Sequence, residues 1–386
     1  MTLSIAVYVS LAAILALLGW HAACRDKVRL ANGEAPLPFY CWECMASVAV
    51  VTLIFALRVK TGTDHMMYLI QYIGVVKREV FSRPEGMEPG FQLITRAFAA
   101  ARCHYTIYFG FWAALQAGLM YFALRKHKFL LPWFALVLIL GPYFINWISF
   151  LRQWVVALGF LAMLPWIVDR KLLPYIVGVA VLAMFHYSAV LLLLFYFLPY
   201  DRMARTSRFT LLAIYVVCFV LGLYPVWLKA LVPVLKGMSL FGYNRYDEML
   251  AEVANGDFRF LTLGPLRLIS IFAQLVCIWY FAEVARQRDT DRLLPVVFGL
   301  TLVGSCYEVL FINTIHFMIR PVDLVYPCMA VMLAYVFEHL YRSRRFVELA
   351  LCLLPVISYL IINVVKVNLH PSPIGECVNY HFFFLK

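Results

Sequence analysis

The sequence is poor in charged residues. Only 14% of its 386 residues are charged and 64% are hydrophobic, whereas a soluble domain is about 25% charged and roughly 45–50% apolar. A soluble domain is therefore excluded, and we expect an all-α polytopic membrane protein. The formal net charge of +12 would favour nucleic acid in a soluble protein. Here topology and contact with anionic membrane lipids explain it, so we expect no nucleic-acid partner.

Several catalytic motifs are also missing. The chain has no Gly-rich phosphate loop, no His-Glu-x-x-His helix, no Gly-x-Ser-x-Gly turn and no dense group of Asp and Glu. An ATP-driven pump, a zinc protease and an esterase each need one of these features. The sequence therefore predicts neither a metal site nor a cofactor.

Long apolar runs bounded by charges dominate the chain. Such runs predict membrane-spanning helices, because only a segment with satisfied backbone groups crosses lipid. The pair 172–186 and 187–200 is short for two spans, which leaves a re-entrant hairpin or one kinked helix as alternatives. We expect about twelve spans, with a range of 11 to 13, over residues 3–23, 42–58, 104–124, 129–147, 150–168, 172–186, 187–200, 209–232, 261–284, 293–313, 321–341 and 346–365.

Basic residues alternate between loops, which predicts the orientation. Basic clusters occupy every second loop, and these loops are expected to be cytoplasmic. Both termini would then lie outside, with two longer outer segments, 59–103 and 233–260, the first of which carries an interfacial helix. The chain is interpreted as one integral domain, 1–386. The clusters are Arg25/Lys27/Arg29, Arg125/Lys126/Lys128, Arg170/Lys171, Arg202/Arg205/Arg208, Arg286/Arg288/Arg292 and Arg342/Arg344/Arg345.

The first outer segment combines a carboxylate with aromatic side chains. Asp64, Tyr68 and Tyr72 are spaced i, i+4, i+8, so a helix would place them along one stripe suited to binding a sugar. The alternative is that Asp64 caps the helix while the tyrosines form an interfacial belt. Glu88 precedes a Pro-Gly turn that opens another helix, and it has either a structural or a chemical role.

Polar side chains recur at the outer ends of the next predicted helices. Arg152 and Gln153 follow an aromatic-rich helix end, and His186 with Ser188 interrupts two apolar half-length helices. An arginine at this depth often only extends its charge to the interface, and a single histidine often bonds a carbonyl in a packed core. Arg152 and His186 are expected on the same face of the membrane, and this favours a functional role for both.

Two further outer segments carry arginine. Arg320 begins the penultimate helix, where pairing with Asp323 in an internal salt bridge is the alternative to substrate binding. Arg245 and Tyr246 lie in the second outer segment. Guanidinium groups present paired donors to phosphate oxygens, so Arg152, Arg245 and Arg320 together favour a diphosphate ligand.

In these pieces the chain resembles the EpsG family of polysaccharide polymerases, which are related in function to the Wzy O-antigen polymerases. The resemblance implies a fold like that of metal-independent C-type glycosyltransferases. It also implies a bacterial inner-membrane enzyme that joins undecaprenyl-diphosphate-linked oligosaccharides on the periplasmic face, often with a protein that controls chain length. The pieces are Asp64-x3-Tyr68-x3-Tyr72, Glu88-Pro-Gly-Phe91, Phe150-Leu-Arg152-Gln-x3-Ala157, Phe185-His186-x-Ser188-Ala189 and the stretch from Arg320 to Tyr326.

Such a reaction needs a base for the acceptor hydroxyl and cations for the departing diphosphate. Arg152 and Arg320 are expected to bind the diphosphate, with Arg245 as a third candidate. His186, Asp64 and Glu88 remain unranked as base or sugar-orienting groups. The expected substrate contacts come from Tyr68, Tyr72, Gln153, Ser188, Arg245 and Tyr246. A polysaccharide ligase, a flippase for a lipid-linked sugar and a non-catalytic scaffold remain the alternatives.

Overall fold

The computed structural model describes residues 1–77, 87–231, 263–314, 316–372 and 375–384. In this part of the chain the regular secondary structure is helical, apart from one isolated β-bridge. Four of its helices are long and apolar enough to cross a membrane, α1 (Thr2–Ala31), α8 (Leu151–Val168), α15 (Pro265–Gln287) and α19 (Phe346–Leu369). The chain is therefore a helical membrane protein.

Further apolar helices are shorter or broken. Helix α5 (Tyr105–Ala123) forms a pair, bent by 117°, with the segment that contains α6 (Leu131–Leu140), and counting the pair as one span gives five. Twelve spans remain a prediction. The remaining apolar helices are α2 (Trp42–Ala56), α9 (Leu172–Ala183), α12 (Arg208–Leu223) and α16 (Leu294–Leu310), and the connecting turns are η2 (Lys128–Leu130), α7 (Phe144–Ser149), α11 (Tyr200–Arg205), η4 (Pro225–Leu231) and α17 (His316–Ile319).

The segment 172–200 turns back on itself. Helix α9 is followed by a 3₁₀ turn, η3 (Tyr187–Leu191), and by the single-turn helix α10 (Leu192–Phe195), both of which pack against α9. The hydroxyl of Tyr175 donates a hydrogen bond of 2.5 Å to the carbonyl of Leu192 across this pair. The geometry favours the hairpin over the kinked helix, with His186 at the reversal.

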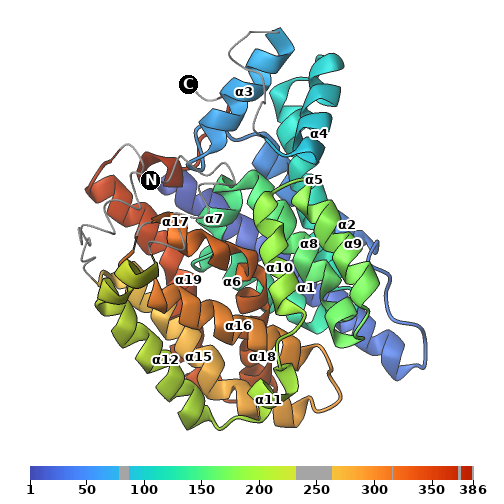
Figure 1. Ribbon diagram of the computed structural model, residues 1–386. Coiled ribbons are helices and arrows are strands. Elements are labelled where there is room, and N and C mark those ends of the chain that lie inside the picture. The colour runs from blue at the N-terminus through green and yellow to red at the C-terminus, as the bar shows by residue number, and fades with distance from the viewer. Residues whose placement is uncertain (78–86, 232–262, 315, 373–374, 385–386) are drawn as a thin grey trace.

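Helix α18 (Tyr326–Arg342) forms the centre of the bundle. Every residue from Tyr326 to Leu340 is buried. It is preceded by the 3₁₀ turn η7 (Arg320–Leu324), and it packs against α6, α15, α16 and α19 (Figure 1). A helix buried on all sides must be apolar all round, which explains why its sequence lacks a polar face along most of its length.

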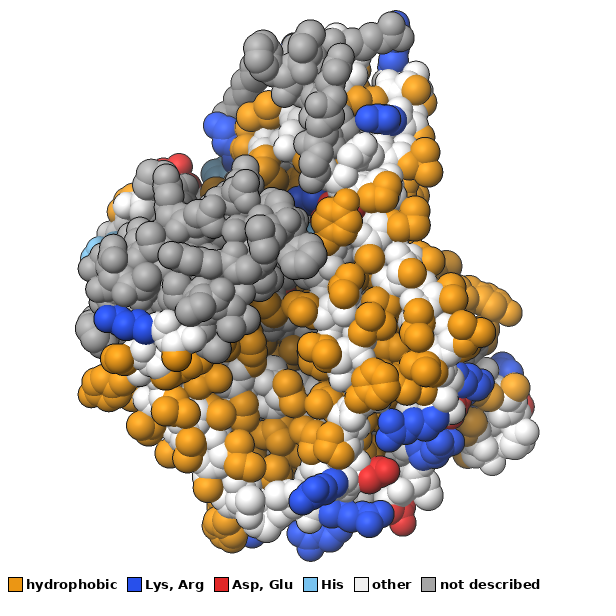
Figure 2. Space-filling model, viewed as in Figure 1, with side chains coloured by type: hydrophobic (Ala, Val, Ile, Leu, Met, Phe, Trp, Pro, Cys, Tyr) orange, Lys and Arg blue, Asp and Glu red, His pale blue; other side chains and the backbone are white. Residues whose placement is uncertain are grey.

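Apolar side chains cover the sides of the molecule, as a lipid-facing surface requires. Leu173 of α9 and Val347 of α19 are each more than 70% exposed. In Figure 2 hydrophobic side chains fill the middle of the visible face, and Lys and Arg gather toward the lower end, where α11 lies and where α15 and α18 end. We call this lower end the basic end.

The opposite, upper end carries both chain termini and two helices, α3 (His65–Lys77) and α4 (Pro89–Ala100) (Figure 1). Aromatic stacking attaches them to α5. The rings of Tyr72 and Tyr108 lie 4.3 Å apart between centroids, and those of Phe91 and Trp112 lie 5.1 Å apart. The stacked rings belong to a second hydrophobic core, which α3 and α4 share with α5 and the start of α8.

The C-terminal tail binds the start of this upper segment. The amide of Val59 donates to the carbonyl of His381 at 2.8 Å, and that of Phe383 donates to the carbonyl of Leu57 at 2.9 Å. The short helix η8 (Gly375–Val378) lies within the tail, and its residue Cys377 accepts a hydrogen bond from the amide of Gly62. The tail thus holds the chain that leads into α3.

Gly62 permits this junction. Its φ is +91°, and a Cβ there would lie 2.7 Å from the carbonyl oxygen of Ile148. We expect Gly62→Ala to lower the free energy of unfolding by about 1–3 kcal/mol, because the side chain meets both a left-handed backbone and a steric clash. Gly118→Ala is the control, since a Cβ at Gly118 meets nothing within 4 Å. Thermal unfolding in detergent measures both variants, and equal melting temperatures would contradict the prediction.

Candidate functional site

Glu88 lies at the centre of a polar cluster at the upper end. One carboxylate oxygen accepts a hydrogen bond of 2.8 Å from Nδ1 of His186 and one of 3.2 Å from the amide of Tyr187. The other oxygen accepts a short charged hydrogen bond from Nη1 of Arg152. Glu88 is only 3% exposed. Three donors from two distant parts of the chain therefore satisfy one buried carboxylate.

Local structure explains why the carboxylate is available. Glu88 is the N-cap residue of α4, with extended backbone angles, and Pro89 occupies the first helical position, which its ring favours. The Glu88 side chain makes no capping hydrogen bond. A purely structural capping role is therefore absent, and the side chain reaches across to α8 and to the hairpin after α9.

Gly90 brings the hairpin close to this helix start. Its amide donates to the carbonyl of Met184 at 2.9 Å, and a Cβ at this position would lie 2.9 Å from the same oxygen. Only glycine permits such an approach without displacement. Because Met184 lies two residues before His186, this backbone contact places the imidazole beside Glu88.

Arg152 is fixed by two partners near the start of α8. Besides its contact with Glu88, its Nε donates a hydrogen bond of 3.3 Å to the hydroxyl of Tyr68. The guanidinium also lies 5.5 Å from the centroid of the Phe91 ring. Its side chain is 19% exposed. The group is thus oriented by Glu88 and Tyr68 and still reaches the surface.

The electrostatic surroundings keep Glu88 charged. Burial opposes the charged form, but the hydrogen bond from His186 and the charge of Arg152 outweigh it and lower the pKa of Glu88 to about 2. Burial raises the pKa of Tyr68, and the nearby Arg152 opposes this effect. Glu88 is therefore a fixed anion and a poor proton acceptor at neutral pH.

This arrangement determines the role open to His186. A charged carboxylate accepts hydrogen bonds, so the proton of a neutral imidazole lies on Nδ1, beside Glu88, and Nε2 carries the lone pair. The side chain is 29% exposed. The hydroxyl of the nearby Ser188 is buried and has no hydrogen-bond partner within the described part of the chain. The imidazole thus offers an accessible acceptor atom held in place by a carboxylate.

Arg320 lies beside this cluster and is linked to it by Gln153, the residue that follows Arg152 in α8. The side-chain amide of Gln153, which is buried, donates a hydrogen bond of 2.7 Å to the carbonyl of Arg320. The Arg320 guanidinium is exposed and lies 5.4 Å from the Phe150 ring centroid. Asp323 accepts a hydrogen bond of 3.2 Å from the side-chain amide of Asn146, and among the described residues no ion pair within 4.0 Å joins it to Arg320. The internal salt bridge considered above is absent.

The other predicted residues lie apart from the cluster. The hydroxyl of Tyr72 donates to the carbonyl of Cys103 at 2.7 Å, and the side chain is 2% exposed. Asp64 precedes α3, and its side chain accepts a hydrogen bond from Thr63. Asp64, Tyr68 and Tyr72, which the spacing placed on one stripe, therefore bind different partners. Arg245 and Tyr246, with the whole segment 233–260, lie outside the described residues.

Sequence reasoning missed the backbone contributions to the site. The Tyr187 amide and the Met184 carbonyl complete the cluster, and no side-chain pattern indicates either. Within the sequence, Gly90 after Glu88-Pro89 is the feature that comes nearest to indicating this close backbone contact. Across the described ranges, no group of three or more His, Cys, Asp or Glu side chains is placed to hold a metal ion.

Comparison with known proteins identifies the class to which this helical membrane protein belongs. The sequence profile of the EpsG family matches residues 42–382. The chain belongs to the EpsG family. The match includes every residue of the cluster around Glu88 and most of the tail that holds the upper segment. No curated protein and no solved structure matches the chain significantly.

The low pKa of Glu88 predicts a pH dependence of stability. A carboxylate whose pKa is lowered on folding stabilises the protein fully above its unfolded pKa, here 4.5, and loses that contribution as the pH falls through about 2. The melting temperature of the wild-type protein should therefore exceed that of Glu88→Gln by a constant margin above about pH 5. The margin should shrink below about pH 4. Melting temperatures of both proteins across this range test it, and a margin that is unchanged down to about pH 3 would refute the paired, charged state.

Proposed function

We propose that the protein polymerises oligosaccharide repeat units carried on undecaprenyl diphosphate into exopolysaccharide, capsule or O-antigen. The observation that supports this most is the convergence of Glu88, Arg152 and His186 at the upper end, within a chain of the EpsG family. The proposal places the protein in a bacterial inner membrane with the upper end on the periplasmic side. Its partners are the lipid-linked substrate, membrane lipids and a chain-length regulator.

In the proposed reaction a sugar hydroxyl of one repeat unit attacks the anomeric carbon of another. Nε2 of His186 takes the hydroxyl proton, the new glycosidic bond forms, and the bond from the anomeric carbon to the diphosphate oxygen breaks. Undecaprenyl diphosphate leaves with the bonding electrons. Glu88 is a positioning residue, because it fixes the imidazole ring and keeps the proton on Nδ1.

The proposed cations stabilise the leaving group. Arg152 and Arg320 come from neighbouring elements, and Gln153 links the two. A guanidinium presents two parallel donors to phosphate oxygens, and both groups reach the surface. Tyr68 holds Arg152, whereas Asp64 and Ser188 remain candidates for orienting the sugars. Tyr72 would contribute indirectly, through its stacking on Tyr108 and its hydrogen bond to Cys103.

An elongation assay tests the proposal directly. Purified protein in nanodiscs is given the undecaprenyl-diphosphate repeat unit of its host, with EDTA present, and product length is followed on gels. A ladder of longer lipid-linked glycans supports a metal-independent polymerase. Transfer of finished polymer to a lipid A acceptor would instead identify a ligase. Movement of the substrate across sealed vesicles without elongation would identify a flippase, and both results would replace the proposal.

Substitution of Arg152 should strongly reduce polymer formation, and it should also lower the melting temperature because Glu88 loses its cation. Loss of a donor to the developing charge reduces the rate about 10²- to 10³-fold, so we expect this loss from Arg152→Ala. Arg152→Lys should also be poor, because an ammonium lacks paired donors. Arg96→Ala is the matched control, since Arg96 is an exposed arginine of the same outer segment. Wild-type product lengths from Arg152→Ala would remove this residue from the diphosphate site.

Replacement of His186 separates its hydrogen bond from its basic nitrogen. In His186→Asn the amide can still donate to Glu88, but no atom replaces Nε2. We expect kcat to fall about 10²- to 10⁴-fold, as for loss of a general base, with KM nearly unchanged. Steady-state kinetics in the elongation assay measure both constants. A raised KM with unchanged kcat would instead make His186 a binding residue.

A further inference from the structure

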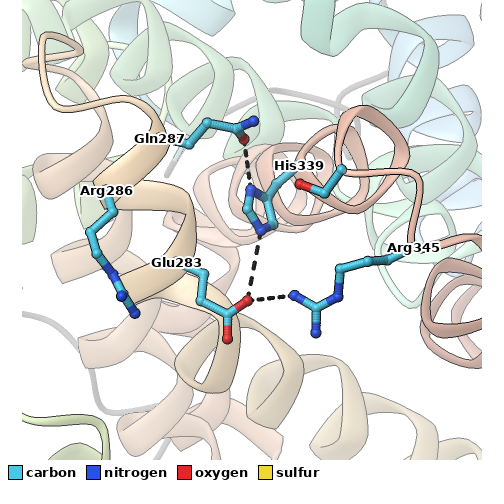
Figure 3. A pocket seen from close by; sticks show the side chains of 6 residues that line it. Glu283, Arg286, Gln287, His339 and Arg345 are labelled. Atoms are coloured by element: carbon cyan, nitrogen blue, oxygen red, sulfur yellow. Dashed lines mark hydrogen bonds and ion pairs between the residues drawn. The ribbon is translucent and has the colours of Figure 1, made fainter.

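A second polar cluster lies at the basic end, away from the cluster around Glu88. It surrounds an open pocket of about 560 Å³ between the C-terminal ends of α15 and α18 and the start of α19 (Figure 3). The proposed polymerase chemistry uses none of these side chains. The residues that line the pocket are Glu283, Arg286, Gln287, His339, Ser343 and Arg345.

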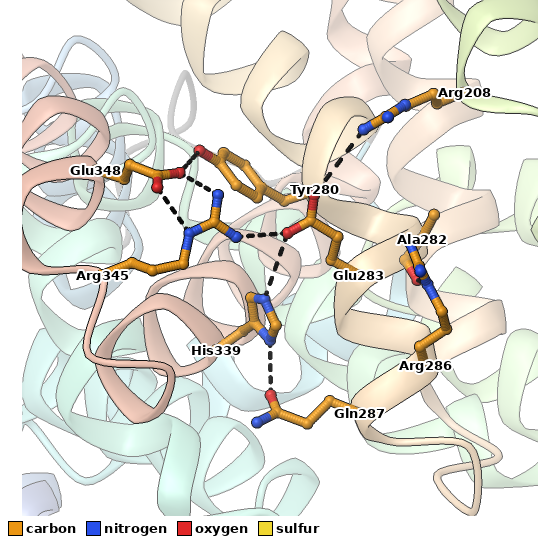
Figure 4. Close-up of polar contacts among 9 residues, drawn as sticks. All are labelled: Arg208, Tyr280, Ala282, Glu283, Arg286, Gln287, His339, Arg345 and Glu348. Atoms are coloured by element: carbon orange, nitrogen blue, oxygen red, sulfur yellow. Dashed lines mark hydrogen bonds and ion pairs between the residues drawn. The ribbon is translucent and has the colours of Figure 1, made fainter.

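The only carboxylate among these lining residues is neutralised by its neighbours. One oxygen of Glu283 accepts a hydrogen bond of 2.6 Å from Nη1 of Arg345, and Nη1 of Arg208 lies 3.9 Å from the other (Figure 4). Arg345 also forms two hydrogen bonds with Glu348. The two carboxylates share the charge of Arg345, and Arg208 lies near one of them, which reduces their repulsion toward an anionic ligand.

Several donors remain directed to solvent at the pocket. Arg286 is exposed, and its Nε donates only to the carbonyl of Ala282 in its own helix, at 3.2 Å. The oxygen of the Gln287 side chain lies 2.6 Å from Nδ1 of His339, so its amide nitrogen is left for another partner. Ser343 is exposed and adds a hydroxyl. These groups together can donate several hydrogen bonds to one phosphate.

An apolar surface begins beside the pocket. Val347, Leu351 and Leu354 follow Arg345 at spacings that place them on one face of α19, and each is at least 59% exposed. On α12, the ring of Phe209 is 67% exposed next to Arg208, whose guanidinium also covers Trp279 at 4.7 Å. Arginine and tryptophan in such contact are typical of the interface between a membrane and water.

From these features we infer that the pocket at the basic end binds the phosphate headgroup of an anionic phospholipid, with its acyl chains along the exposed face of α19. The charge of Arg286, the donors of Gln287 and Ser343 and the adjoining apolar stripe match the two halves of such a lipid. The inference does not depend on the polymerase proposal, because it requires only that the helices lie in a membrane.

Lipid binding to the full-length protein in detergent provides the test. Phosphatidylglycerol should raise the melting temperature and remain bound in native mass spectrometry, whereas zwitterionic phosphatidylethanolamine should do so only weakly. Arg286→Glu should weaken phosphatidylglycerol binding about five- to thirtyfold, as expected for one or two interfacial charges. Arg205→Glu is the matched control, because Arg205 is exposed at the same end and does not line the pocket.

Each other outcome would overturn the inference. Equal losses in Arg286→Glu and Arg205→Glu would mean that the surface attracts lipid only through its overall charge. Equal stabilisation by soluble glycerol phosphate would assign the pocket to a soluble phosphate ester and not to a lipid. Ser343→Ala provides a second variant that leaves every ion pair intact, and it should weaken binding by about threefold, as for loss of one neutral hydrogen bond. Unchanged lipid binding in both pocket variants would exclude the site.

Discussion

The upper end of this protein depends on the ion pair between Glu88 and Arg152. A buried carboxylate is costly without a cation and hydrogen bonds, and here both are supplied by segments that are distant in sequence. The pair connects α4, which projects from the bundle, to α8, which is buried within it. Through His186 it also holds the hairpin after α9. One interaction thus fixes the relative positions of three elements.

The rest of the molecule supports that interaction. Helix α18, buried along almost its whole length, provides the rigid centre against which α8 and η7 pack. The aromatic rings between α3, α4 and α5 fix α3 and α4 to the bundle, and the C-terminal tail fixes the chain that leads into α3. Tyr68 and Gln153 then bring Arg152 and Arg320 to neighbouring positions. The residues of the polar site are therefore held by well-packed helices, which keep their side chains in fixed positions.

Much of this arrangement follows from the sequence. The alternation of basic loops grouped Glu88, Arg152 and His186 on one face, because a helix that crosses a membrane carries its two ends to opposite sides. The separate roles of these residues could not be predicted from the sequence. His186, Asp64 and Glu88 were unranked candidates for the base. The hydrogen bond between Glu88 and His186 and the ion pair with Arg152 are the contacts on which we propose a positioning role for Glu88 and a basic role for His186.

Other features depend on tertiary contacts that no local pattern encodes. The spacing of Tyr68 and Tyr72 predicted one stripe, yet one hydroxyl meets Arg152 and the other meets a backbone carbonyl. The tail pairs with residues more than 300 positions away, and the ion pair of Arg345 with Glu283 links the start of α19 to the C-terminal part of α15. Long-range pairing of this kind is set by packing and not by periodicity.

The most direct test of the account is a double-mutant cycle between Glu88 and His186, read as kcat/KM for elongation. If Glu88 acts by positioning the imidazole, Glu88→Gln should reduce the rate strongly in the wild-type background and very little in His186→Asn. The double variant should then be about as active as His186→Asn alone. Losses that multiply, as for two independent sites, would contradict the claim that Glu88 and His186 form one catalytic unit.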